Sequence, residues 1–108
     1  MALYIKFKKE YASFDIDTII KEEIEMNSVR TWRYEGNRFT HKPRQWERNV
    51  WLENTESGED WVKYDVFPGD VDPMTSMEYA IACGRFVEMV ISHYSENIED
   101  IKVEPFLE

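Results

Sequence analysis

Hydrophobic and polar residues alternate at the start of the chain and then change to helical spacing. Leu3, Ile5 and Phe7 alternate with Tyr4, Lys6 and Lys8, which is the period-2 pattern of a strand with one buried face. From Asp15 onward, isoleucines at positions 16, 19, 20 and 24 recur at helical spacing among acidic residues. The pattern predicts a strand within residues 1–9, followed by a short helix capped by Asp15.

The middle of the chain is rich in aromatic and β-branched residues, and turn signals interrupt it. Residues 29–34 and 38–42 flank the sequence Glu35-Gly36-Asn37, which predicts a hairpin because Gly and Asn accept the positive φ of tight turns. Residues 46–53 and 61–67 predict two further strands. The segment 54–60 between them is polar and acidic, and we expect an exposed loop there.

A long apolar pattern near the C-terminus predicts a helix from about Pro73 to Tyr94. Either Asp72, which precedes the proline, or a capping box of Thr75 and Glu78 would start this helix. Two apolar stripes run along it: Met77, Ile81, Gly84, Val87 and Ile91, and beside them Tyr79, Cys83, Phe86 and Val90. We expect this helix to lie across the sheet, with Gly84 permitting a close approach of helix and sheet.

The order of predicted elements is one strand, one helix, four strands, the long helix and a last edge strand near Ile101 and Val103. This order predicts an α+β fold, with an antiparallel sheet of about five to six strands packed on one face by the long C-terminal helix. A chain of 108 residues suits one hydrophobic core, so we expect a single domain over residues 1–108.

Two features of the composition bear on location. No stretch approaches the roughly 20 apolar residues that a membrane-spanning helix requires, so we expect no membrane association. Cys83 is the single cysteine and has no partner for an internal disulfide. A reduced thiol indicates a cytoplasmic location.

Motifs for catalysis, metals and cofactors are absent from the sequence. Cys83 and His93 would lie about 15 Å apart along one helix, at about 1.5 Å per residue, too far for a nucleophile and its base. The histidines are too few for a zinc site, Asp70 and Asp72 lack the EF-hand spacing, and isolated glycines form no phosphate loop. We expect no enzyme, no metal and no cofactor. A carboxylate active site without a motif stays open as an alternative.

Charge is divided unevenly along the chain, whose formal net charge is −9. Residues 30–48 carry a local net of +4, which leaves −13 for the remainder. A cluster of acids around two tryptophans can dock on a basic surface of another protein. The residues predicted to bind such a partner are Trp51, Glu53, Glu56, Glu59, Asp60, Trp61 and Asp70.

This acidic surface favours a small protein-binding module. The preferred hypothesis is an inhibitor of the immunity, antitoxin or phage anti-defence type, which blocks a basic surface of a nuclease or of another nucleic-acid-handling protein. A solvated acidic face that only keeps the protein soluble is the alternative reading of the same residues.

The main rival is a nucleic-acid-binding module that uses the basic, aromatic segment from Arg30 to Arg48. Its cations could attract phosphates while its aromatic rings stack on bases, and the candidate residues are Arg33, Arg38, His41, Lys42, Arg44 and Arg48. We favour a different interpretation, in which Trp32 and Tyr34 face the core and the arginines pair with nearby acids. A homodimer is also open, through opposite charges or through edge strands at the termini.

Overall fold

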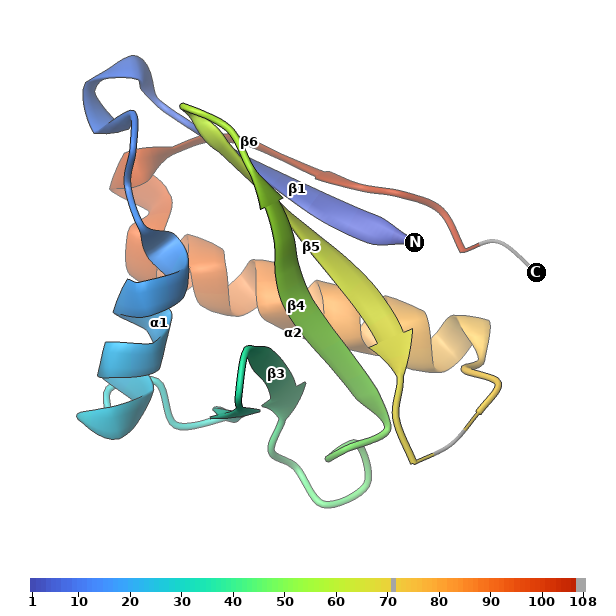
Figure 1. Cartoon of the computed structure of the whole chain (residues 1–108). Helices are drawn as coiled ribbons and strands as arrows, with labels where there is room; N and C mark the ends of the chain where they lie inside the picture. The colour runs from blue at the N-terminus through green and yellow to red at the C-terminus, as the bar shows by residue number, and fades with distance from the viewer. Residues whose placement is uncertain (71, 107–108) are drawn as a thin grey trace.

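The computed structural model describes residues 1–70 and 72–106, and it confirms the predicted α+β fold (Figure 1). Six strands form one antiparallel sheet in the order β2-β3-β4-β5-β1-β6. The elements in chain order are β1 (Ala2–Phe7), η1 (Lys9–Tyr11), α1 (Ile16–Glu25), β2 (Trp32–Glu35), β3 (Arg38–His41), β4 (Val50–Ser57), β5 (Trp61–Pro68), α2 (Ser76–Tyr94), η2 (Ser95–Asn97) and β6 (Ile98–Val103). In the described part of the chain, no helix is both long and apolar enough to cross a membrane.

The N-terminal strand and helix form as the pattern predicts. Leu3, Ile5 and Phe7 of β1 are all buried against the helices. Asp15 caps α1, because its carboxylate accepts hydrogen bonds from the Thr18 backbone N–H at 3.2 Å and from the Thr18 hydroxyl at 2.8 Å. The cap satisfies one of the free N–H groups at the helix start.

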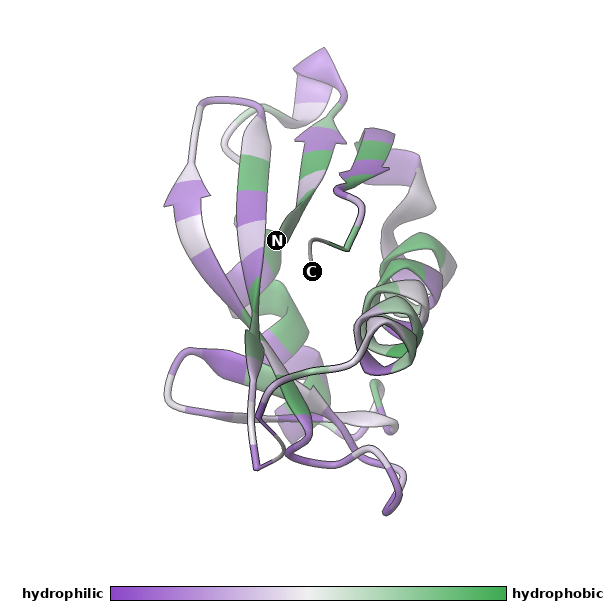
Figure 2. Cartoon of the chain, turned by 90° about the vertical axis from the view of Figure 1, so that its right-hand side faces the viewer, coloured by the Kyte–Doolittle hydropathy of each residue, from purple (hydrophilic) through white to green (hydrophobic). Residues whose placement is uncertain are grey.

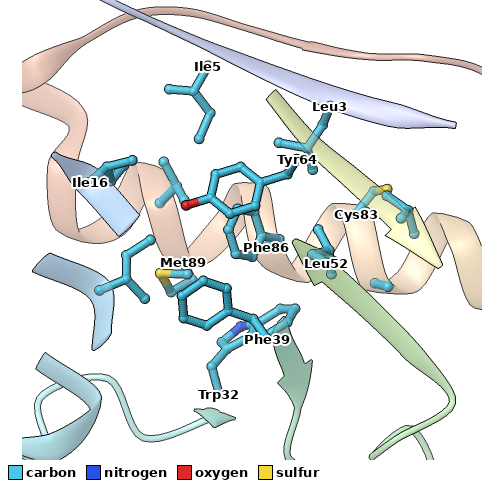
Figure 3. Packing of buried hydrophobic residues seen from close by; sticks show 14 of the residues in the cluster. Leu3, Ile5, Ile16, Trp32, Phe39, Leu52, Tyr64, Cys83, Phe86 and Met89 are labelled. Atoms are coloured by element: carbon cyan, nitrogen blue, oxygen red, sulfur yellow. The ribbon is translucent and has the colours of Figure 1, made fainter. Parts of the chain in front are cut away.

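The long helix α2 begins at the capping box rather than at Pro73. The Thr75 hydroxyl accepts from the Glu78 N–H at 3.1 Å, and the Glu78 carboxylate accepts from the Thr75 N–H at 2.9 Å. In the middle of the helix, the ring of Phe86 lies 5.2 Å from Trp32 and 4.9 Å from Tyr64 (Figure 3). These rings join α2 to the sheet and form the centre of the core.

Only one of the two apolar stripes on α2 is buried. Tyr79, Cys83, Phe86 and Val90 belong to the core, whereas Gly84 is exposed and a Cβ atom placed on it would have nothing within 4 Å. The prediction that Gly84 brings helix and sheet together is therefore wrong. Viewed along α2, the sheet curves over one side of the helix and leaves the other side open (Figure 2).

The boundaries of β4 differ from the sequence prediction at both ends. Residues 46–49 form turns instead of a strand, because the Thr40 hydroxyl accepts the Arg48 backbone N–H at 2.9 Å and Arg48 takes a positive φ of 66°. At the other end the strand continues to Ser57 through a bulge, with Glu56 opposite Lys63. The predicted loop over residues 54–60 is therefore a tight turn at residues 58–60.

Candidate protein-binding surface

Trp51 lies on the open face of the sheet, opposite the helices, but its side chain is covered. It alternates with the core residues Val50 and Leu52 along β4, and only 8% of its surface is exposed. The guanidinium carbon of Arg33 lies 5.7 Å from the indole centroid. A Cβ atom on Gly69 would come within 2.8 Å of the indole nitrogen. Trp51 therefore packs within the protein and offers little surface to a partner.

The arginines of the open face are paired with carboxylates of the same face. Arg33 donates to Glu47 at 2.7 Å and to Glu35 at 3.1 Å, and Arg48 donates to Glu35 at 3.0 Å. The hydrogen bond from Arg33 holds the pKa of Glu35 below its usual value, and Arg48 adds to this effect. The pairing agrees with the favoured interpretation of the basic segment.

A second pair on this face involves a residue predicted to bind a partner. Arg38 donates to Glu53 at 2.9 Å across the β3–β4 pair, and its guanidinium carbon lies 4.7 Å from the Phe67 ring centroid. Glu53 is thus engaged within the protein. Exposed pairs of this kind contribute about 0.2–1 kcal/mol each, so their main effect here is to neutralise local charge.

The remaining residues of the basic segment are divided between the core and the solvent. His41 is buried, with its ring 5.1 Å from that of Trp32, and desolvation lowers its pKa. Trp32 is fully buried, and the Tyr34 hydroxyl donates to Glu25 at 2.6 Å. Lys42 and Arg44 are exposed and form none of the ion pairs found among residues 1–70 and 72–106.

Four of the predicted partner-binding residues meet at the turn between β4 and β5. This group, called the acidic tip below, consists of Glu56, Glu59, Asp60 and Trp61. Glu56 and Glu59 are exposed, and Asp60 is half-buried. Their three carboxylates form none of the ion pairs found in the described residues. The tip therefore combines negative charge with a half-buried tryptophan.

Backbone hydrogen bonds hold the acidic tip in place. The Glu59 carbonyl accepts the Ser13 N–H at 2.7 Å, and the Asp60 carbonyl accepts the Phe7 N–H at 2.7 Å. The indole of Trp61 covers Gly58, where an added Cβ atom would overlap its ring nitrogen. Because the hydrogen bonds from Ser13 and Phe7 fix the backbone of the turn, the positions of the acidic side chains are defined.

Asp70 does not belong to the acidic tip. Its N–H donates to the Arg48 carbonyl at 2.8 Å, beyond the other end of β5. The strand β5 has eight residues, and its length separates Asp70 from the tip by about 24 Å, since the rise between successive residues is about 3.4 Å. The seven predicted residues therefore divide into the tip, the paired or covered residues Glu53 and Trp51 on the open face, and the distant Asp70.

One neighbour of the tip was not among the predicted site residues. Asp15 shares a shallow cleft of about 330 Å³ with Glu59 and Gly58, so the start of α1 adds an acid to the same end of the molecule. No sequence signal connected them, because Asp15 and the tip are more than 40 positions apart and meet only through tertiary structure.

Groups with catalytic potential are scattered in this fold. Cys83 is buried, and desolvation raises the pKa of its thiol to about 11. The Nδ1 atom of His93 lies 3.6 Å from Glu23 on α1. Among the described residues, no group of three or more His, Cys, Asp and Glu side chains is arranged to hold a metal ion.

Comparison of the chain with protein-family models, curated proteins and solved structures gave no match. The acidic tip differs from the rest of the predicted surface in both its geometry and its charge.

Proposed function

We propose that this protein is a protein-binding module whose acidic tip docks on a basic surface of a partner protein. The proposed mode of action is inhibition in the cytoplasm, of the immunity, antitoxin or phage anti-defence type. The partner would be a nuclease or another nucleic-acid-handling protein, since such proteins present basic surfaces to polyanions. The residues assigned to binding are Glu56, Glu59, Asp60 and Trp61.

The observation that supports this proposal most is that carboxylates on the open face form ion pairs, whereas those of the acidic tip do not. On the open face, Glu35, Glu47 and Glu53 are paired with arginines, whereas the tip carboxylates have no such partners in the described residues. Glu56 interacts electrostatically with Lys63 opposite it on β5, but it forms no ion pair in the described residues. The tip carboxylates, on a chain with a formal net charge of −9, would steer a basic partner toward the tip and accelerate association.

The rigidity of the tip also favours binding. Its backbone is already held by hydrogen bonds to Ser13 and Phe7, so association would order few additional groups, and this lowers the entropic cost. Trp61 combines an apolar ring with an N–H donor, the kind of residue that dominates binding energy at many interfaces. Its ring lies 6.5 Å from that of Tyr4, which extends the aromatic surface along β1.

The same pairing weighs against the nucleic-acid alternative. A phosphate would have to displace Glu35, Glu47 and Glu53 from Arg33, Arg48 and Arg38 before it could bind these cations. Two of the aromatic rings needed for base stacking are turned toward the core, since Trp32 is 1% exposed and Phe39 is fully buried, and Tyr34 and Trp46 are half-buried. Among the assigned cations, Lys42 and Arg44 are exposed without an ion pair in the described residues.

A charge-reversal pair of variants tests the proposal. The tip variant carries Glu56→Lys, Glu59→Lys and Asp60→Lys. The control carries the same change in net charge at exposed acids elsewhere, Glu22→Lys, Asp72→Lys and Glu96→Lys. Each tagged protein is used to capture partners from its native cells after nuclease treatment. The main captured protein is then purified and its affinity measured by calorimetry.

The proposal predicts a basic protein that binds the wild type and the control but loses at least tenfold affinity for the tip variant. Its activity on nucleic acid should fall when the wild type is added. Equal loss of binding by both triple variants would show that only net charge matters, and material that disappears on nuclease treatment would favour the rival. Either outcome overturns the assignment of the tip.

A further inference from the structure

Three of the four large hydrophobic side chains that are most exposed in the described residues lie on α2 and β6. They are Met77 (61% exposed), Ile91 (50%) and Val103 (42%). An apolar groove runs between the two elements, lined by Val87 and Ile91 of α2 and by Ile98, Ile101 and Val103 of β6. Ile91 and Val103 therefore share this groove, whereas Met77 is not part of its lining. Exposed apolar side chains that share a groove are typical of an interaction site.

Strand β6 beside this groove is an edge strand whose outer side is open to pairing. It pairs with β1, and its other side pairs with no strand among residues 1–70 and 72–106 (Figure 1). The Glu104 N–H donates to the Ala2 carbonyl at 2.9 Å, and Val103 lies opposite Leu3. Because backbone groups alternate along a strand, the N–H and C=O groups of Ile101 and Val103 point to the open side.

The side chains of Asp100, Ile101 and Lys102 in β6 are complementary to a second copy of the same segment. Ile101 lies opposite the core residue Ile5 and so faces the groove, whereas Asp100 and Lys102 lie opposite Lys6 and Tyr4 on the open face. In an antiparallel pair of two β6 strands centred on Ile101, a residue that precedes Ile101 by a given number of positions faces the residue of the second copy that follows Ile101 by the same number. Ile101 would face Ile101 of the second copy, and Asp100 would face Lys102 in both directions.

We propose that the protein forms a homodimer in which two β6 strands pair antiparallel about a two-fold axis at Ile101. The two sheets become one continuous sheet. The axis stands perpendicular to the sheet, so both α2 helices lie on the same side of it. The sheet already curves over one side of α2 (Figure 2), and the added strand continues that curve above the open side of the helix. Val87 and Ile91 are then covered by the second copy, and Val103 lies opposite Glu99 of that copy.

The dimer also explains why β6 leaves backbone N–H and C=O groups open at the edge of the sheet. An open strand with outward N–H and C=O groups invites uncontrolled pairing, and a defined partner removes that hazard. The register shift at Glu99, which lies between Asp100 opposite Lys6 and Ile98 opposite Phe7, ends the regular ladder and limits the pairing to the segment around Ile101. The dimer surface uses none of the residues of the acidic tip, so it is independent of the proposed function.

A charge swap tests this dimer specifically. In Lys102→Asp, Asp100 of each copy would face the carboxylate introduced in the other copy, which replaces two attractive contacts by two repulsive ones. In the double variant Asp100→Lys/Lys102→Asp, opposite charges face each other again in both directions. Lys9→Asp, an exposed change on η1, is the control with the same change in net charge as the single variant. Far-UV circular dichroism establishes that each variant is folded.

Sedimentation equilibrium over a range of concentrations measures the dissociation constant of the dimer. We expect dimers for the wild type and the control, at least tenfold weaker association for Lys102→Asp, and recovery of most of that loss in the double variant. A monomeric wild type at all concentrations tested overturns the proposal. So does a double variant that associates no better than the single variant, since the register at Ile101 would then be wrong.

Discussion

Phe86 is the residue whose truncation should cost the fold most. Its side chain is fully buried, and its ring contacts those of Trp32, Tyr64 and Phe39 at centroid distances of 5.2, 4.9 and 6.1 Å. Phe86→Ala removes a side chain that joins α2 to β2, β3 and β5. Because large rings surround the site, it can collapse only partly, and we expect a loss of about 3–5 kcal/mol. Since small domains are stable by about 5–15 kcal/mol in total, the variant should be close to unfolding.

Urea denaturation followed by far-UV circular dichroism is the suitable assay. Tryptophan fluorescence is unsuitable, because Trp32 lies against the mutated ring and its signal would change without unfolding. All samples should be compared at one protein concentration, so that self-association affects them equally. Phe86→Leu should lose about 1–2 kcal/mol, because it retains most of the volume. Ser92→Ala, on the exposed side of the same helix, should change stability by less than about 0.5 kcal/mol. If Phe86→Ala loses no more than Ser92→Ala, the position of the core is wrong.

Four further predictions concern single residues. Cys83 should react slowly with a thiol reagent at pH 8 in the folded protein and rapidly in urea, because it is buried and its thiol pKa is raised to about 11; equal rates would contradict the packing of α2. His41 has a folded-state pKa below its usual 6.5, so below about pH 6.5 the unfolded chain binds a proton that the folded protein does not. The free energy of unfolding should therefore fall, by about 1.4 kcal/mol for each unit by which folding lowers the pKa. Urea titrations at pH 7.5 and 5.5 should show a smaller loss in His41→Phe than in the control His93→Gln. Gly84→Ala should raise the free energy of unfolding by about 0.5–1 kcal/mol, because the site is open and helical. Gly69→Ala should lower the melting temperature, since the new Cβ atom would overlap the Arg48 carbonyl oxygen; thermal melts of both glycine variants check the contrast.

Local sequence patterns were sufficient to predict a helix or strand when one of its faces is buried in the core and the other is exposed to water. The alternation of Leu3, Ile5 and Phe7 predicted β1, and Asp15 predicted the start of α1, because both depend on residues within a few positions. The capping box of Thr75 and Glu78 likewise started α2. These features also determined the order of the elements and thus the α+β fold.

The predicted binding surface depended on exposure, which a local pattern does not reveal. Trp51 is on the water-facing side of β4, yet it is covered by Arg33 from β2 and by the chain near Gly69. Glu53 resembled the tip acids in sequence, but Arg38 on the neighbouring strand pairs with it. Long-range neighbours decided which acids remained unpaired.

The sequence by itself determined the sheet, the two helices and the division of charge along the chain, since hydrophobic periodicity and composition are local properties. Only the tertiary structure decided that the sheet curves over one side of α2, which left Ile91 and Val103 exposed and gave Gly84 no neighbour to approach. It also decided which of the acids meet at the tip, because the turn after β4 is three residues long rather than seven. The physical reason is the same in both cases: strand pairing and the packing of one layer on another join residues that are far apart in the chain.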